Sequence, residues 1–306
     1  MNLSLLHDYF TDRLQQNVSL SNHTNAKVGG IAACLVVENN SNSLALDAEW
    51  LWKNDIPFLV LGSGANVLIS SGLLDMVILL NRANKIELLQ DDQETVVRAE
   101  SGSILASVAR FAAQNSLSGL EWAYTIPGTL GGAVYGNAGA FGGDMSKSLK
   151  MAHILHRQSG RITLSVEEMA YSYRSSALKR TPGDAIILGA DLFVHQGDEA
   201  EIRSIMDANV SQRKSTQPGG ASMGSTFKNP VGDHAGRLIE AAGLKGTRIG
   251  GVQVSPVHAN FLINDGTATS EDYYHLIKLV RESVLEKSGI QLELEIELLG
   301  NWQALA

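Results

Sequence analysis

The chain has 306 residues, of which 44% are hydrophobic and 18% charged, so it can bury a sizeable core and is not wholly disordered. Its 24 Lys and Arg residues against 32 Asp and Glu residues give a formal net charge of −8. This acidic balance argues against general nucleic-acid binding, which needs a basic surface. A local basic pocket for a phosphorylated small molecule remains compatible with it.

A single cysteine, Cys34, excludes an intramolecular disulfide and a zinc site built from cysteines. The eight histidines include no H-E-x-x-H motif, and we expect no metal centre. The first residues show no basic leader followed by an apolar core, and no apolar stretch approaches the roughly 20 residues of a membrane helix. We therefore expect a cytoplasmic protein of two or three domains that uses neither a membrane nor a metal.

In the N-terminal third, the hydrophobic periodicity predicts an amphipathic helix over residues 3–16, with Leu3, Leu6, Phe10 and Leu14 on one face. Short apolar runs then predict strands at residues 33–39, 57–62, 76–81 and 95–100.

The rest of the chain mixes both kinds of element. A helix is expected from a cap at Ser103 to about Asn115. Strands are expected at 151–157, 161–166, 185–194 and 291–300, and helices at 198–214, 233–243 and 269–289. Thr269 and Asp272 form a capping-box pattern at the start of the last helix. Without a steady strand–helix–strand rhythm, the pattern favours an α+β fold over a doubly wound sheet.

A first glycine loop, Gly62-Ser63-Gly64, follows an apolar strand and superficially begins a dinucleotide fingerprint. Val67 stands where the third glycine belongs, and the next strand starts too soon for a crossover helix, so a Rossmann fold is excluded. The loop can still offer backbone N–H groups to a pyrophosphate. A hairpin-like turn without a ligand fits these residues equally well.

A second glycine loop is richer, because eight of the 30 glycines fall within residues 119–143. Pro127-Gly128 sets a turn, and Gly131-Gly132 lets the backbone pass close to a flat or charged group. Few side chains here can fill a core, which favours a large ligand pressed against the main chain. A purely structural loop is the alternative.

Six motifs in order resemble the UDP-N-acetylenolpyruvoylglucosamine reductase family, the flavoenzymes of bacterial peptidoglycan precursor synthesis. They are Gly62–Asn66, Ile126–Phe141, Tyr173–Lys179, Gln217–Pro230, His258–Phe261 and Leu292–Ile296. The chain departs from the family pattern at Gly136, usually methionine, and at Leu178, often aromatic. The short spacing from Arg174 to Ser225 resembles a compact subtype without an extra tyrosine-bearing loop.

The resemblance implies a flavin-binding fold like that of vanillyl-alcohol oxidase over residues 1–195, made of two α+β subdomains that divide near residue 80. A smaller α/β substrate-binding domain is expected over 196–306. The implied reaction is reduction of the enolpyruvyl ether of a UDP-sugar to a lactyl ether, giving UDP-N-acetylmuramate. FAD, bound non-covalently, is the implied cofactor, and NADPH and the UDP-sugar are the implied partners.

The resemblance also assigns site residues. Those implied for FAD lie in the two glycine loops: Gly62, Ser63, Gly64, Ala65, Asn66, Pro127, Gly128, Thr129, Gly131, Gly132, Ala133, Asn137, Gly139 and Ala140. Those implied for the substrate are Tyr173, Gln217, Lys228, Asn229 and His258.

By motif position, the resemblance also implies three catalytic residues. Arg174 would hold the substrate carboxylate, Glu295 would stabilise an enol-like intermediate, and Ser225 would deliver a proton. Serine barely ionises, so it would need a neighbour such as Lys228 to lower its pKa. Each residue also has a plain alternative: a surface arginine, an acidic strand edge at residues 293, 295 and 297, and a turn-forming serine.

Two other functions compete with this one. A flavin oxidase of the same fold acting on an alcohol would need a base and oxygen, which the motif around Ser225 disfavours. A non-catalytic nucleotide-sugar-binding protein would have no use for Arg174, Ser225 and Glu295 together.

Overall fold

The computed structural model describes residues 1–90 and 94–302, which divide into two units. The first unit contains Met1–Gln15, Cys34–Ser63 and Met76–Arg213. The second contains Gln16–Ala33, Gly64–Asp75 and the chain from Lys214 onward. Residues 16–33 and 64–75 therefore belong with the C-terminal part of the chain. Within the described ranges, no helix is long and apolar enough to cross a membrane.

The first unit is built on an antiparallel sheet in the order β12-β11-β13-β7-β6, with β8 paired to β13. Its strands are β6 (Ile86–Gln90), β7 (Thr95–Glu100), β8 (Leu117–Ser118), β11 (Leu149–His156), β12 (Gly160–Ser165) and β13 (Ala185–Gln196). The register places Ala190 opposite Ala99 and Leu192 opposite Val97, and all four side chains are buried in one core.

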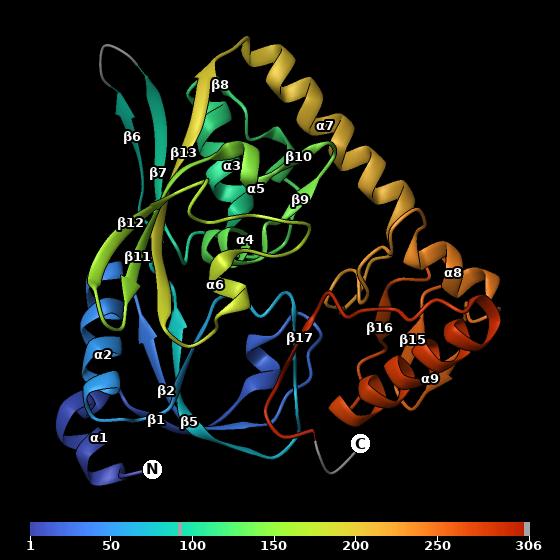
Figure 1. Ribbon diagram of the computed structural model, residues 1–306, viewed down its shortest axis with the longest axis horizontal. Coiled ribbons are helices and arrows are strands. Elements are labelled where there is room, and N and C mark those ends of the chain that lie inside the picture. Colours follow the sequence, from blue (N-terminus) through green and yellow to red (C-terminus); the bar gives the residue numbers. More distant parts are fainter. Residues whose placement is uncertain (91–93, 303–306) are drawn as a thin grey trace. The chain divides into compact units, whose positions relative to one another are not determined.

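Helices α3 (Leu105–Gln114), α4 (Leu130–Gly136) and α5 (Met145–Ser148) lie on one face of this sheet (Figure 1). Alanines at 109, 112 and 133 contribute to the same core and let the helices approach it closely. Four short elements, η3 (Glu121–Ala123), β9 (Gly139–Ala140), β10 (Gly143–Asp144) and α6 (Ala177–Arg180), lie in the connections of this unit. The long helix α7 (Glu199–Thr216) contributes Ile202 and Met206 to a small cluster with Ala113.

A second core of the first unit surrounds the parallel pair β3 (Phe58–Leu61) and β5 (Leu73–Asn81). Strand β2 (Ile31–Glu38) contributes Cys34 and Val36, and helices α1 (Leu3–Phe10) and α2 (Ser41–Lys53) contribute apolar faces. Helix α2 was missing from the sequence prediction. Its apolar side chains sit at helical spacing, and the Asn40 side chain caps it by accepting a hydrogen bond from Ser43 N at 2.8 Å.

Three sequence predictions need correction. The first helix ends at Phe10 and not near residue 16, because Thr11 has a positive φ of 52°. A short η1 (Thr11–Arg13) and strand β1 (Gln15–Ser19) follow it. The cap residue of α3 is Ile104 rather than Ser103, whose buried hydroxyl has no partner among the described residues. The expected strand over 291–300 is reduced to β17 (Glu297–Leu299).

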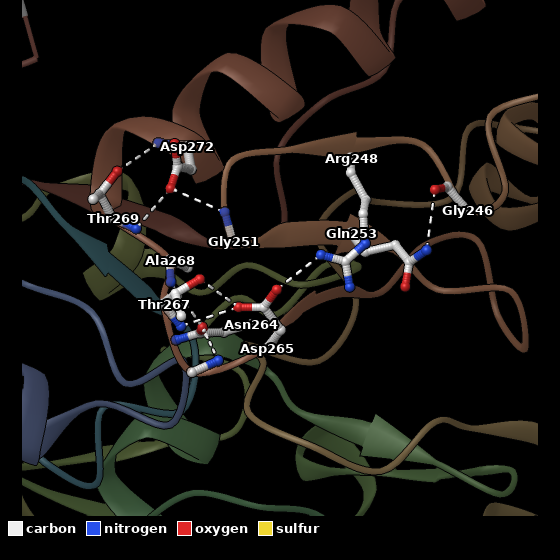
Figure 2. Close-up of polar contacts among 11 residues, drawn as sticks. Gly246, Arg248, Gly251, Gln253, Asn264, Asp265, Thr267, Ala268, Thr269 and Asp272 are labelled. Carbon is white, nitrogen blue, oxygen red and sulfur yellow. Dashed lines mark hydrogen bonds and ion pairs between the residues drawn. The ribbon is translucent and has the colours of Figure 1, made fainter.

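The second unit packs α8 (Ala235–Ala241) and α9 (Ser270–Ser288) against the antiparallel strands β14 (Arg248–Ile249), β15 (Val252–Val254) and β16 (Leu262–Asn264). Strand β4 (Val67–Ile69) pairs in parallel with β17, and η2 (Leu20–His23) also belongs to this unit. The predicted capping box of α9 is confirmed: Thr269 Oγ1 accepts from Asp272 N, and the Asp272 carboxylate accepts from Thr269 N (Figure 2). The expected α+β class is confirmed as well.

An acidic pair lies buried in the first unit. Glu38 is fully buried, and neither of its carboxylate oxygens has a hydrogen-bond partner among the described residues. The guanidinium of Arg13 lies 3.7 Å from Glu38 but binds Asp47 at 2.7 Å. Burial, and next the neighbouring Asp47, raise the pKa of Glu38 to about 8.

We expect Glu38 to make the first unit less stable as the pH rises from about 4.5 towards 8, because the folded chain keeps a proton there that the unfolded chain releases. Replacing Glu38 with Gln should remove this dependence of the free energy of unfolding on pH. Its slope is at most about 1.4 kcal/mol per pH unit. Urea unfolding midpoints measured across this range test the prediction. Glu49→Gln, an exposed change on α2, is the control. Equal pH dependence in the wild type and the Glu38 variant would contradict it.

Candidate functional site

Gly62, in the part of the first glycine loop that belongs to the first unit, lies against the second glycine loop. Gly62 follows β3, and a Cβ atom placed on it would lie 2.5 Å from Thr129 Oγ1 of the second loop. A side chain at position 62 would therefore push the two loops apart. The close approach of Gly62 to Thr129 explains why position 62 is a glycine. It also brings together two of the residues predicted to bind FAD.

The start of α4 is fixed by backbone hydrogen bonds to the turn before α3. Leu130 N donates to Ser103 O and Gly131 N to Ser101 O, both at 2.8 Å. A Cβ on Gly131 would lie 2.9 Å from the Ser101 side chain, so this glycine is required by close packing. The Asn81 side chain donates to Ser101 Oγ at 2.8 Å, which ties the end of β5 to the same turn.

Gly132 differs from these glycines. A Cβ there would meet only Thr129 Oγ1, at the ordinary contact distance of 3.7 Å. No backbone acceptor for its N–H occurs among residues 1–90 and 94–302. An open amide beside open space fits a ligand that approaches the main chain closely, and a flavin diphosphate has this chemistry. The residues of the loop therefore fit FAD.

Asn137 has a clear structural role at the end of α4. It adopts a left-handed conformation with φ 48°, and its side chain donates to Ser172 O and accepts from Ser146 N, both at 3.0 Å. Its amide thus holds together three segments of the first unit. Gly139 and Ala140 follow it and form β9.

Tyr173 and Arg174 occupy the tip of a tight turn closed by reciprocal backbone hydrogen bonds between Ser172 and Ser175. Arg174 has a φ of 55° and directs its guanidinium towards the carbonyls of Asn137, at 3.5 Å, and Gly139, at 3.2 Å. The same guanidinium lies 5.3 Å from the centre of the half-exposed Tyr173 ring.

This turn is anchored on α4. Ser176 Oγ donates to Tyr135 O at 2.7 Å, and Tyr171 OH donates to Val134 O at 2.9 Å. Arg174 is therefore positioned by the chain that follows the second glycine loop. Arg174 and the glycine loop thus lie together in the first unit.

Ser225 and Glu295 come together in the second unit. Ser225 forms a β-bridge with Phe261, and its neighbour Thr226 accepts a hydrogen bond from Glu295 N at 2.9 Å. Asn260 holds this arrangement by accepting from Phe227 N and donating to Phe227 O, at 2.9 and 2.8 Å. The segments that carry Ser225 and Glu295, far apart in sequence, are thus fixed side by side.

Asn66 from the first glycine loop joins them. The unit boundary falls between Ser63 and Gly64, so Gly64, Ala65 and Asn66 belong to the second unit. The side chain of Asn66 donates to Glu295 O at 3.0 Å, and its carbonyl accepts from Glu297 N at 2.9 Å. Glu295 lies in a bend before β17, which corrects the expectation that residues 293, 295 and 297 share a strand face.

The residues predicted to bind the substrate in this unit have varied surroundings. Lys228, which the sequence suggested as the neighbour of Ser225, directs its ammonium to Glu293 at 3.3 Å. Asn229 accepts from Ala235 N and so helps to begin α8. Gln217 has a buried side-chain oxygen without a partner in the described part of the chain, as has Thr226 Oγ1. Both oxygens are buried.

His258 is partly buried against Phe261, with the ring centres 5.0 Å apart. Its Nδ1 accepts from Asn260 N at 3.2 Å, and burial lowers its pKa. Both features favour the neutral imidazole, which supports Asn260. No group of three or more His, Cys, Asp or Glu side chains that could hold a metal occurs within residues 1–90 and 94–302.

Two arginines near the glycine loops were missed by the sequence analysis. Arg82 Nη1 donates to Gly62 O at 2.9 Å, and Arg213 Nη1 donates to Thr125 O at 2.7 Å. Both are partly buried, and burial lowers the pKa of each. The only sequence signal for Arg82 is a basic residue directly after an apolar strand.

Comparisons with known proteins identify the family of each part of the chain. Residues 32–163 match the FAD binding domain family, and residues 215–299 match the C-terminal domain family of UDP-N-acetylenolpyruvoylglucosamine reductase. The reductase of that name from Bacillus subtilis is 40% identical over 287 residues, covering 93% of each chain. That from Chloroflexus aggregans is 38% identical over 289 residues, 94% of this chain and 97% of its own.

A solved structure is similar over the same extent. The crystal structure of UDP-N-acetylenolpyruvylglucosamine reductase from Thermus caldophilus aligns with a TM-score of 0.79 and 31% identity, covering 94% of this chain and 99% of that one. The flavin-binding fold expected from the sequence is thereby confirmed. On this sequence identity and coverage, the chain belongs to the UDP-N-acetylenolpyruvoylglucosamine reductase family.

Proposed function

We propose that this protein reduces the enolpyruvyl ether of UDP-N-acetylglucosamine enolpyruvate to UDP-N-acetylmuramate, with FAD as its cofactor and NADPH as the electron donor. It is an oxidoreductase of the CH–CH group that serves peptidoglycan precursor synthesis. The observation that carries this proposal is the hydrogen bond from Glu295 N to Thr226 O, which fixes Glu295 beside Ser225 in a chain of this family.

The first unit supplies the features that suit FAD. The glycine loops meet at Gly62 and Thr129, and the amide and open space at Gly132 fit a diphosphate. When bound, FAD accepts a hydride from NADPH and supplies one to the double bond of the substrate. We assign FAD binding to the region 1–195 and substrate binding to 196–306, in line with the family matches at 32–163 and 215–299.

Hydride addition to the terminal enolpyruvyl carbon leaves negative charge on the adjoining carbon and its carboxylate. Arg174 suits this carboxylate because a planar guanidinium binds both oxygens of a carboxylate. Its turn is anchored on α4 and its φ is positive, so the guanidinium is positioned by the backbone. The ring of Tyr173 supports it at 5.3 Å.

Ser225 is the proposed proton donor to the carbon next to the carboxylate. Glu295 is the proposed polar group that stabilises the enol-like intermediate by hydrogen bonding. Because the substrate carries UDP and the chain has one cysteine, we place the protein in the cytoplasm.

A visible spectrum distinguishes this function from its competitors. The purified protein should be yellow, bleach with NADPH in the absence of oxygen, and recover its colour on addition of the enolpyruvyl sugar. Recovery with oxygen but not with the sugar would favour a flavin oxidase. A protein that binds the UDP-sugar but shows no spectral change with NADPH would be a binding protein.

We expect the flavin to be non-covalent, because the second loop offers small residues and Asn137, whose side chain is already bound by Ser172 and Ser146. Precipitation with acid should therefore release all the yellow colour into the supernatant. Colour that stays in the pellet would contradict this expectation. A heated sample clarified by centrifugation serves as an independent release control.

Gly132→Val should abolish flavin binding and leave the fold intact. The new side chain has room within the protein, since a Cβ there meets only Thr129 Oγ1 at 3.7 Å, but it occupies the space assigned to the cofactor. The flavin-to-protein absorbance ratio of the purified variant measures the effect, and circular dichroism checks the fold. Gly136→Val, also in α4 and in open space, should keep FAD. Stoichiometric FAD in the Gly132 variant would show that the loop is misassigned.

Ser225→Ala should separate the two half-reactions. Oxidation of NADPH needs no acid from the protein, so bleaching should proceed at near the wild-type rate. Removal of a positioned proton donor should slow reoxidation by the enolpyruvyl sugar at least ~10²-fold. Stopped-flow absorbance measures both steps on one sample, with Ser222→Ala as the control from the same loop. Normal reoxidation would exclude Ser225 as the acid, and equal slowing of both steps would indicate a positioning role.

A further inference from the structure

Arg82 is a partly buried cation that no carboxylate in the described chain neutralises. It follows directly after β5, and burial lowers its pKa without any charged neighbour acting on it. Its Nη1 donates to Gly62 O at 2.9 Å and to Asn81 O at 3.2 Å. Its Nε and Nη2 donors have no acceptor within residues 1–90 and 94–302.

Two other arginines of the first unit are paired with carboxylates. Arg98 makes two hydrogen bonds to Asp191, at 2.6 and 2.8 Å, and Arg13 binds Asp47 at 2.7 Å. Removing a guanidinium from water without an anion costs free energy that those pairs recover. Among the described residues Arg82 has no such pair, as Arg213 has none, and a ligand anion beside Arg82 would account for its charge.

The surroundings of Arg82 indicate which anion. Its guanidinium is held on the carbonyl of Gly62, the residue where the first glycine loop contacts Thr129 of the second. Its neighbour Asn81 is tied to the turn at Ser101, which also binds the Gly131 amide. A planar guanidinium with two unused donor positions matches the oxygens of a phosphate group.

We propose that Arg82 binds the diphosphate of FAD, with Nη1 holding the Gly62 carbonyl and the remaining donors directed to the phosphate oxygens. The inference rests on the proposed function, because FAD is the diphosphate assigned to these loops. The UDP-sugar also carries a diphosphate, so the experiment separates the two ligands.

The test is the dissociation constant of FAD, obtained by diluting the purified flavoprotein and measuring the fluorescence of released flavin at low and high salt. Arg82→Gln should raise this constant by roughly 10- to 100-fold at low salt, the range for a lost charged hydrogen bond. The wild-type constant should rise with salt, and that of the variant should rise less. Arg82→Lys should keep much of the salt dependence, because it keeps the charge.

The matched control is Arg157→Gln, which removes the same charge from an exposed pair with Asp55 in the same unit. It should leave the dissociation constant within about twofold of the wild type. The KM for the UDP-sugar should change little in Arg82→Lys.

Several results would overturn the proposal. FAD binding in Arg82→Gln within twofold of the wild type would do so. Weakened binding with unchanged salt dependence would show that Arg82 only anchors Gly62. A raised KM for the UDP-sugar with normal FAD binding would assign Arg82 to the other diphosphate. If Arg82→Gln does not fold, the salt dependence of Arg82→Lys decides. A colourless wild-type protein that also binds no added FAD would instead refute the proposed function.

Discussion

The hydrogen bond from Gly131 N to Ser101 O is the constraint on which the first unit's glycine loops depend. It forms only because position 131 has no side chain, since a Cβ there would strike Ser101. The bond fixes the start of α4, and Thr129, at the cap of that helix, meets Gly62. The end of β5 joins the same turn through Asn81. One close backbone approach thus fixes the start of α4, which carries Gly132 and anchors the Arg174 turn.

The glycines of these loops divide into two kinds, a distinction that composition alone does not reveal. Gly62 and Gly131 are required by contacts within the protein, because a side chain at either position would collide with a neighbour. Gly132 and Gly136 border open space. The first kind shapes the loop, and Gly132 leaves main chain accessible to a ligand. A glycine-rich motif therefore contains both positions that packing requires and positions that border open space.

The sequence predicted elements well where the signal was local. The run TVVRAE became β7 without change of bounds, and the pair Thr269 and Asp272 correctly marked the start of α9. The prediction was wrong where a single backbone angle determines the structure, as at Thr11, which ends the first helix. It was also wrong where a tertiary contact does so, because Leu294 makes a lone bridge with Phe227 instead of extending a strand. The proximity of Ser225 and Glu295 was expected only through family resemblance. The role proposed for Arg82 rests on its contact with Gly62, and no spacing in the sequence indicates that contact.

The pairing of β4 with β17 has a consequence for how the chain is made. Val67 lies opposite Glu297 in a parallel register, so an early segment of the chain needs a very late one as its partner. Contacts this far apart in sequence slow folding, because a long loop must close before they form. During synthesis the second unit cannot close until residues 297–299 have left the ribosome, and the Gly64–Asn66 half of the first glycine loop waits with it. The contacts that hold Asn66, at the end of the first glycine loop, therefore form late in synthesis.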